Sequence, residues 1–185
     1  PRQDHAPIAP WLAQKTGMIA IGGPVWSREG VGYGNALLSR YPVDRVRRWD
    51  LSVGRHEPRG ALDVELTICG RTVHVLNTHL GLWPRERPQQ ADRLLELLSL
   101  SRRDLTILMG DLNEWHGWGK SLRGLRRVFG SPAAPVTFPA RWPVLALDRI
   151  WIFPAQALLT VEAHDTPRSR LASDHLPVKA DIYLP

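Results

Sequence analysis

The sequence has a single cysteine among its 185 residues, Cys69, and this scarcity excludes two kinds of structure. An internal disulfide cannot form, and a zinc site built from several cysteines is ruled out. No run of apolar residues approaches the roughly 20 that a helix needs to cross a bilayer. The chain also opens at Pro1 without the charged, apolar and small-residue order of a signal peptide. We therefore expect a cytoplasmic protein, although a targeting segment ahead of Pro1 would not be visible in this sequence.

Acidic residues are in the minority, with 18 Asp and Glu against 24 Lys and Arg, so the formal net charge is +6. Such a balance favours anionic partners: nucleic acid, phosphorylated metabolites or anionic lipid headgroups. Two Arg-rich stretches, 45–48 and 123–127, either attract polyanions or form solvated faces. The length and the 43% hydrophobic content suit one sizeable core, so we expect a single domain over 1–185 and leave its oligomeric state open.

The apolar pattern mixes helices with strands. Residues 7–18, which contain Gly17 near their end, predict a helix, and the glycines between 22 and 34 predict a loop. Because the pairs at 61–78 and 146–161 look like antiparallel meanders, we expect layered sheets with outer helices and not a doubly wound sheet. Strands are expected at 61–68, 72–78, 104–109, 146–153, 157–161 and 176–184, and helices at 88–98 and 122–129.

Carboxylate, amide and imidazole groups gather at four predicted strand ends. Asp111 and Asn113 lie two positions apart, so they share a face if the backbone stays extended. Asp174 beside His175 sets a hard oxygen ligand next to a group that titrates near neutrality, as metal-assisted phosphoester hydrolysis requires. The four segments are Asn77-Thr78-His79-Leu80, Gly110-Asp111-Leu112-Asn113, Leu147-Asp148-Arg149-Ile150 and Ser173-Asp174-His175-Leu176-Pro177.

In this order and spacing, the four segments resemble the endonuclease/exonuclease/phosphatase superfamily, and residues 33–40 resemble an early strand of that family. The resemblance runs from about Gly17 onward. It implies an α/β (α+β) fold of the deoxyribonuclease I-like kind: a four-layer α/β/β/α sandwich in which helices flank two packed mixed sheets. It also implies a hydrolase that uses Mg²⁺, with Mn²⁺ as a substitute. The implied partner is a phosphoester substrate, for example in nucleic acid or in a phospholipid headgroup.

The resemblance also implies a role for each matching residue. Asp111 would orient or deprotonate the attacking water, and Asn113 would hold a nonbridging phosphate oxygen. His175, steadied by Asp148, would act as an acid/base or bind the phosphoryl group, while Asp174 would contribute to the magnesium site. Asp111 and Asn113 also have a purely structural alternative, an Asx turn that closes a strand.

The second imidazole, His79, would stabilise charge or protonate the leaving group. Glu57 resembles the carboxylate on which this histidine leans, although Glu57 can equally pair with Arg55 or Arg59 in solvent. Two imidazoles, each oriented by a carboxylate, can straddle a phosphodiester and serve opposite ends of an in-line displacement. The sequence leaves open which of the two is the base.

Eight tryptophans are many for this length, and three of them directly follow the predicted catalytic strand ends. Trp83, Trp115 and Trp118 form either the rim of the site or a cap over the two-sheet core. On a rim, the rings would stack on exposed bases or sit at a lipid interface beside a headgroup. We hold the two interpretations to be equal.

Family members begin with one strand that carries an asparagine and another that ends in Gln-Glu, whose glutamate is the principal magnesium ligand. Neither precedes Pro1. Three explanations fit: a fragment of a longer protein, a partner chain that fills the gap, or a domain without catalysis. We favour the first, and the function that we expect then belongs to the longer protein. The rival function is a noncatalytic module that binds phosphate or polyanions without the metal, recognised by binding with no turnover in Mg²⁺ or Mn²⁺.

Overall fold

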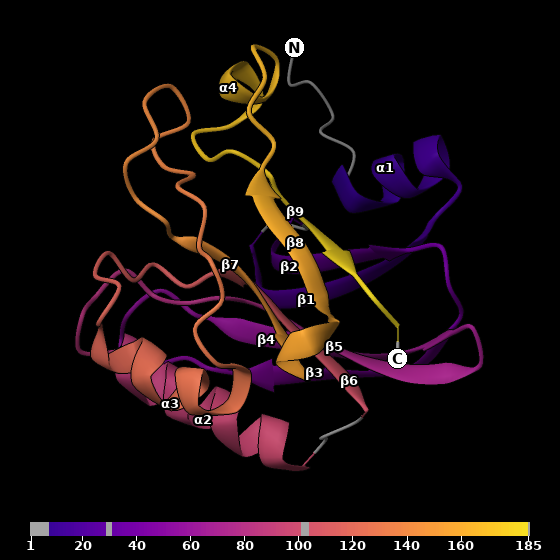
Figure 1. Cartoon of the computed structure of the whole chain (residues 1–185), viewed down its shortest axis with the longest axis horizontal. Coiled ribbons are helices and arrows are strands. Elements are labelled where there is room, and N and C mark those ends of the chain that lie inside the picture. Colours follow the sequence, from indigo (N-terminus) through magenta and orange to yellow (C-terminus); the bar gives the residue numbers. More distant parts are fainter. Residues whose placement is uncertain (1–7, 29–30, 101–103, 185) are drawn as a thin grey trace.

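A five-stranded mixed sheet forms the centre of the computed structural model, which describes residues 8–28, 31–100 and 104–184 (Figure 1). In spatial order its strands are β3 (Val43–Asp50), β4 (Gly60–Ile68), β5 (Arg71–His79), β6 (Leu105–Asp111) and β7 (Asp148–Phe153). Neighbouring strands are antiparallel except for β5 and β6, which are parallel. A parallel pair needs a crossover connection, and α2 (Arg87–Leu100) lies in it.

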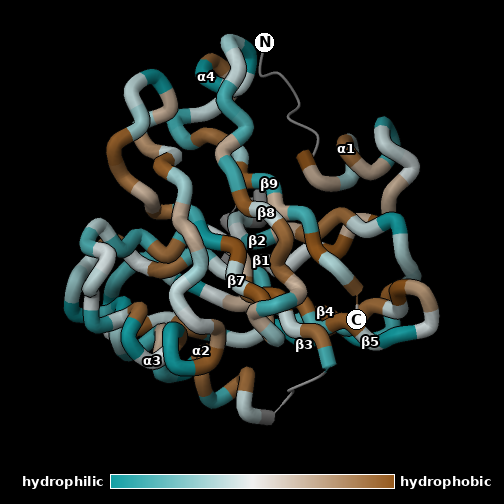
Figure 2. Tube along the Cα trace, viewed as in Figure 1, coloured by the Kyte–Doolittle hydropathy of each residue, from teal (hydrophilic) through white to brown (hydrophobic). Residues whose placement is uncertain are grey.

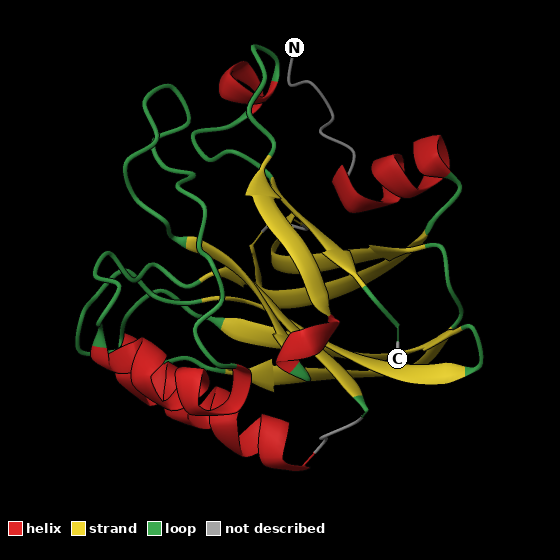
Figure 3. Cartoon of the chain, in the orientation of Figure 1, coloured by secondary structure: helices red, strands yellow, loops and turns green. Residues whose placement is uncertain are grey.

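Two helices cover one face of this sheet, α2 and α3 (Lys120–Phe129) (Figure 3). Alternate residues of the strands, such as Leu76 and Leu108, belong to one buried cluster with Leu94 of α2 and Leu122 and Phe129 of α3. Along both helices hydrophobic residues alternate with hydrophilic ones (Figure 2), as expected for helices that bury one side. The full burial of side chains such as these stabilises the layer by about 1.5–3 kcal/mol each.

Two two-stranded antiparallel sheets cover the opposite face of the central sheet: the hairpin of β1 (Ile19–Arg28) and β2 (Val31–Ser39), and the pair β8 (Leu158–Ala163) and β9 (Val178–Ile182). Ile21 and Leu37, one from each strand of the hairpin, are buried in a cluster with Leu62 and Val64 of β4. The expected four-layer α/β/β/α sandwich is confirmed, with α1 as the outer helix on the hairpin side (Figure 1). The remaining elements are α1 (Ile8–Thr16), the 3₁₀ turn η1 (Ala155–Ala157) and α4 (Ser169–Ala172). Among the described residues, no helix combines the length and the apolar character that crossing a bilayer requires.

The predicted meander at 61–78 is confirmed as the antiparallel pair β4 and β5, but two other expectations are wrong. The glycine-rich stretch 22–34 is largely strand, in β1 and β2, and not a loop. Gly23 explains this, because a Cβ there would lie 3.1 Å from Leu62 Cβ, so the glycine allows close approach of the two layers. The stretch 146–161 is not a strand pair, since β7 pairs with β6 and β8 pairs with β9.

The first Arg-rich stretch belongs to a strand that the sequence pattern did not predict. Residues 45–48 lie in β3, an edge strand of the sheet in which no residue is fully buried. Charged side chains on an edge strand discourage pairing with another chain, which gives the arginines a structural use. The second stretch, 123–127, lies on α3, where Leu125 is buried.

Gly110 sets the distance between the two parallel strands. It lies opposite Thr78 in the β5/β6 register and has φ +142°, a backbone conformation that favours glycine. A Cβ at this position would lie 1.8 Å from the Thr78 carbonyl oxygen. The absence of a side chain therefore lets β6 end beside β5, and the next pair in the register is His79 and Asp111.

Replacing Gly110 by alanine is expected to lower the free energy of unfolding by about 3–5 kcal/mol, because the methyl group meets backbone and the φ value is strained. Gly70→Ala is the matched control. Gly70 also has a positive φ, of +77°, but a Cβ there meets nothing within 4 Å. Gly70→Ala should therefore lower the free energy of unfolding by only about 1–2 kcal/mol. Urea denaturation of both variants measures the difference, and equal losses would contradict the role assigned to Gly110.

Candidate active site

Three chemically active side chains lie in one row across the ends of neighbouring strands. His79 ends β5, Asp111 ends β6 and Asp148 begins β7, and the ladder pairs His79 with Asp111 and Asp111 with Asp148. His175 joins them from the segment between α4 and β9. Rigid strands thus fix the spacing of three groups, and a loop supplies the fourth.

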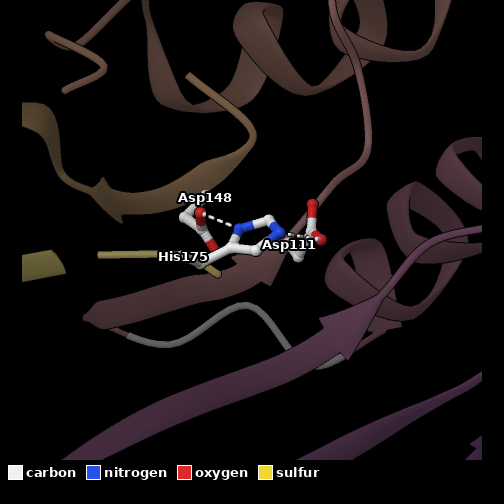
Figure 4. Close-up of side chains that lie close together, drawn as sticks. All are labelled: Asp111, Asp148 and His175. Atoms are coloured by element: carbon white, nitrogen blue, oxygen red, sulfur yellow. Dashed lines mark hydrogen bonds and ion pairs between the residues drawn. The ribbon is translucent and has the colours of Figure 1, made fainter. Parts of the chain in front are cut away.

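Both imidazoles, those of His79 and His175, approach the carboxylate of Asp111. His79 Nε2 lies 3.5 Å from Asp111 Oδ2, and His175 Nε2 lies 4.0 Å from the same oxygen. On its other side, His175 Nδ1 lies 2.8 Å from Asp148 Oδ2, so the imidazole sits between two carboxylates (Figure 4). The Thr137 hydroxyl donates a hydrogen bond to the same Asp148 oxygen. This arrangement fixes the orientation of the His175 ring.

Burial and neighbouring charge act differently on the three titrating groups. Burial raises the pKa of Asp111 above its ordinary value, against the hydrogen bond from the Asn113 backbone and the charge of His79. Burial lowers the pKa of His79, and the charge of Arg59 lowers it further. Burial would also lower the pKa of His175, but the hydrogen bond and charge of Asp148 outweigh it and raise that pKa. His175 is therefore the better cation and His79 the better neutral imidazole.

Asp111 and Asn113 adopt the turn that the sequence left open as an alternative. The Asn113 backbone N–H donates to Asp111 Oδ1 at 2.8 Å, and Asn113 has φ +49°. Its side-chain amide is buried and donates to the Leu80 carbonyl oxygen at 2.8 Å. The turn thus ties the β6 loop to the β5 loop. A role for the Asn113 side chain at a phosphate oxygen stays a prediction.

Glu57 is not in contact with His79. Its carboxylate Oε2 accepts a hydrogen bond from Arg59 Nη2 at 2.7 Å, one of the two alternative pairings considered from the sequence. Glu57 still acts on His79 through space, since its charge raises the pKa of that imidazole. The expected carboxylate next to His79 is instead Asp111.

A divalent cation fits one group of side chains in the described part of the chain. One ligand atom from each of Asp111, Asp148 and His175 lies within 4.8 Å of the other two. Two carboxylates suit the oxygen preference of Mg²⁺, and the imidazole suits Mn²⁺ as well. Asp174, the metal ligand expected from the sequence, lies outside this group, with Oδ1 at 3.3 Å from Ser173 Oγ. Its role as a ligand stays a prediction.

The three tryptophans expected on the rim or over the core are all exposed, so they do not cap the core. Trp83 is 61% exposed, Trp115 60% and Trp118 80%. Trp83 stacks on His56, with ring centroids 5.8 Å apart, and Trp118 stacks on His116 at 5.5 Å. Their rings are therefore available to a ligand on the loops that follow β5 and β6.

Sequence reasoning missed the polar contacts that hold those two loops together. Arg87, in the first turn of α2, donates from Nη1 to the Leu82 carbonyl oxygen at 2.6 Å. Its Nε lies 3.7 Å from Glu114 Oε2, which accepts a hydrogen bond from Ser121 at 2.6 Å. Arg87 and Glu114 are both buried. Nothing in their local sequence distinguishes them from exposed charges, so only the fold identifies them.

Comparisons with known proteins identify the family of the chain. The sequence model of the Endonuclease/Exonuclease/phosphatase family matches residues 3–175. The uncharacterized protein YbhP of Escherichia coli (strain K12) is 36% identical over 163 residues, which are 82% of this chain and 63% of YbhP. The chain thus spans less than two thirds of that relative.

Solved structures show the same fold. The endonuclease/exonuclease/phosphatase from Bacteroides vulgatus superposes with a TM-score of 0.76 and 19% identity, over 91% of this chain and 77% of that one. The mannosyl-6-phosphatase Bt3783 of Bacteroides thetaiotaomicron VPI-5482 superposes with a TM-score of 0.70 and 18% identity, over 90% of this chain and 76% of that one. At these identities, the likeness concerns the fold.

The Asp148 carboxylate is expected to determine the charge of His175. Asp148→Asn removes the negative charge and weakens the hydrogen bond to Nδ1, so the pKa of His175 should fall below its value in the unaltered protein. Asp174→Asn is the control, because the charge of Asp174 is the last in order among the causes that raise this pKa. NMR titration of the His175 ring in metal-free buffer measures both. An equal fall in the two variants would contradict the pairing.

Proposed function

Because this chain belongs to the endonuclease/exonuclease/phosphatase family, we propose that the protein hydrolyses a phosphoester by direct attack of water, with Asp111, His79 and His175 around the phosphorus. The observation that carries the proposal is the shared oxygen of Asp111, which lies 3.5 Å from one imidazole and 4.0 Å from the other. A phosphoryl group at this point can meet a base and two donors at once.

In the proposed reaction, water attacks the phosphorus and the bond from phosphorus to the leaving oxygen breaks. Asp111 takes the proton of the attacking water, and its raised pKa makes it a better base than an exposed aspartate. His175, kept protonated by Asp148, gives a proton to the leaving oxygen through Nε2. His79, neutral because its pKa is lowered, donates a hydrogen bond to a nonbridging oxygen.

A divalent cation, Mg²⁺ or Mn²⁺, would be held by the carboxylates of Asp111 and Asp148, because a protonated His175 has no lone pair to offer it. The chemistry that such an ion supplies is polarisation of a phosphoryl oxygen. The protein's own contribution is the orientation of both carboxylates, which the β6/β7 ladder and Thr137 provide.

The substrate class is a phosphodiester or a phosphomonoester. Support comes from the family and from a structural neighbour named as a mannosyl-6-phosphatase. The net charge of +6 and the exposed rings of Trp83, Trp115 and Trp118 favour a substrate that is anionic and offers a flat or apolar group, such as a nucleotide or a lipid headgroup.

Asp111→Asn and His175→Ala should each reduce hydrolysis by at least about 100-fold, because each removes a proton-transfer group. Release of nitrophenol from bis-p-nitrophenyl phosphate and from p-nitrophenyl phosphate, with Mg²⁺ or Mn²⁺, measures the loss. Asp165→Asn is the control, since Asp165 is an exposed residue paired with Arg170. Undiminished rates in both site variants would remove the assignment.

The rate should depend on pH as a bell. It rises as Asp111 loses its proton, at a pKa above the ordinary 3.8, and falls as His175 loses its proton, at a pKa above the ordinary 6.5. Asp148→Asn lowers the pKa of His175, so it should move the alkaline limb to lower pH; the acid limb should move in the same direction, because the charge of Asp148 also raises the pKa of Asp111. Rates of the two proteins measured from pH 4 to 10 test this, and an unmoved alkaline limb would refute His175 as the proton donor.

A further inference from the structure

Arg59 is a buried cation with most of its hydrogen-bonding capacity unused. It directly precedes β4, is 3% exposed, and pairs through Nη2 with Glu57, whose side chain is 49% exposed. Nε and Nη1 are buried and have no acceptor among the residues that the structure describes. These two atoms carry three of the five N–H donors of a guanidinium. Because such unmade bonds are costly, an acceptor is expected at this place.

The backbone around Arg59 holds the side chain in position. The Arg59 carbonyl oxygen accepts a hydrogen bond from Leu51 N–H at 2.8 Å, and its own N–H donates to Ser52 Oγ at 3.2 Å. The adjoining Gly60 carbonyl oxygen accepts from Asn35 Nδ2 at 2.8 Å and from the Thr78 hydroxyl at 3.0 Å. The segment is therefore tied to three neighbouring parts of the chain, and the guanidinium is preorganised for a ligand.

Arg59 and His79 line the same small cavity, of about 60 Å³. No carboxylate is among its described lining residues, which are Tyr33, Gly34, Asn35, Pro58, Arg59, Gly60 and His79. Arg59 also lines a second cavity, of about 180 Å³, whose wall contains both Arg48 and Asp50. A negatively charged group is favoured in the first cavity, because no carboxylate among the described lining residues opposes it there.

The row of strand ends contains two carboxylates and no arginine or lysine, whereas the cavity is lined by Arg59. Asp111 and Asp148 repel a phosphoryl group, and His175 lies between their two carboxylates. His79 Nε2 lies 3.5 Å from Asp111 and its ring also lines the cavity, so the row and the cavity meet at His79. A cation on the cavity side of His79 would offset the repulsion.

We propose that Arg59 and His79 form an oxyanion subsite, in which the guanidinium donates hydrogen bonds to phosphoryl oxygens of the substrate. The subsite rests on the proposed function, because it places Arg59 against the same substrate. Guanidinium hydrogen bonds to phosphate are charge-assisted and among the strong ones in proteins. Arg59 is thus a substrate-binding residue that recognises the anionic group next to His79.

Binding of inorganic phosphate by the whole chain tests the subsite without any need for turnover. In the unaltered protein, phosphate should shift the ¹⁵Nε resonance of Arg59, which a purely structural arginine would not show. Arg59→Gln should weaken phosphate binding by about 10- to 100-fold in calorimetry. Arg55→Gln is the matched control, since it removes the same charge from an exposed arginine four residues away.

Circular dichroism checks that each variant folds. If Arg59→Gln does not fold, Arg59→Lys takes its place in the binding measurement. The lysine keeps the charge and loses the planar donors, so phosphate binding should still weaken by about tenfold. An Arg59 resonance that does not move with phosphate, or equal phosphate binding by the folded Arg59 and Arg55 variants, would overturn the subsite.

Hydrolysis of p-nitrophenyl phosphate, measured in parallel, separates the two proposals. In the subsite account Arg59→Gln lowers kcat/KM by about 10- to 100-fold and Arg55→Gln does not. Phosphate binding through Arg59, with no turnover of any phosphoester by the full-length protein in Mg²⁺ or Mn²⁺, would refute hydrolysis and keep the subsite. Turnover with phosphate binding that does not depend on Arg59 would refute the subsite alone.

Discussion

The close approach of β5 and β6 is the constraint on which the candidate site depends. Gly110 has no side chain, so β6 ends against the Thr78 carbonyl group and places Asp111 beside His79. The antiparallel pairing of β6 with β7 then brings Asp148 to the other side of Asp111. Three functional groups from three strands are fixed by backbone pairing alone, without relying on flexible loops.

This packing has an electrostatic consequence. Two carboxylates and two imidazoles, each within 4.0 Å of at least one other member of the group, cannot all keep their ordinary protonation behaviour. Burial raises the pKa of Asp111 and lowers that of His79, while Asp148 raises that of His175. One site thereby contains a base, a neutral donor and a protonated donor. Arg59 adds a cation to the cavity that His79 also lines, and the charge of Arg59 lowers the pKa of His79.

Much of the fold and of the site could be predicted from the sequence, because strand ends with Asp, Asn and His are local patterns in a recognisable order. The four layers and the contact between Asp148 and His175 agree with that reading. The pairings of β7 and β8 could not be predicted, since strand partners depend on packing between layers and not on the local alternation of apolar residues. Buried charges are hidden for the same reason: Arg59 reads like an ordinary surface arginine in the sequence, and its partner Glu57 was expected on His79.

A crystal structure with Mn²⁺ and inorganic phosphate bound is the most direct test of the central claim, that the row of strand ends surrounds one phosphoryl group. The account predicts phosphate oxygens within hydrogen-bond distance of His79 Nε2 and His175 Nε2, with the cation on the carboxylates of Asp111 and Asp148. A phosphate or a cation bound elsewhere, with this row left empty at saturating concentrations, would contradict it.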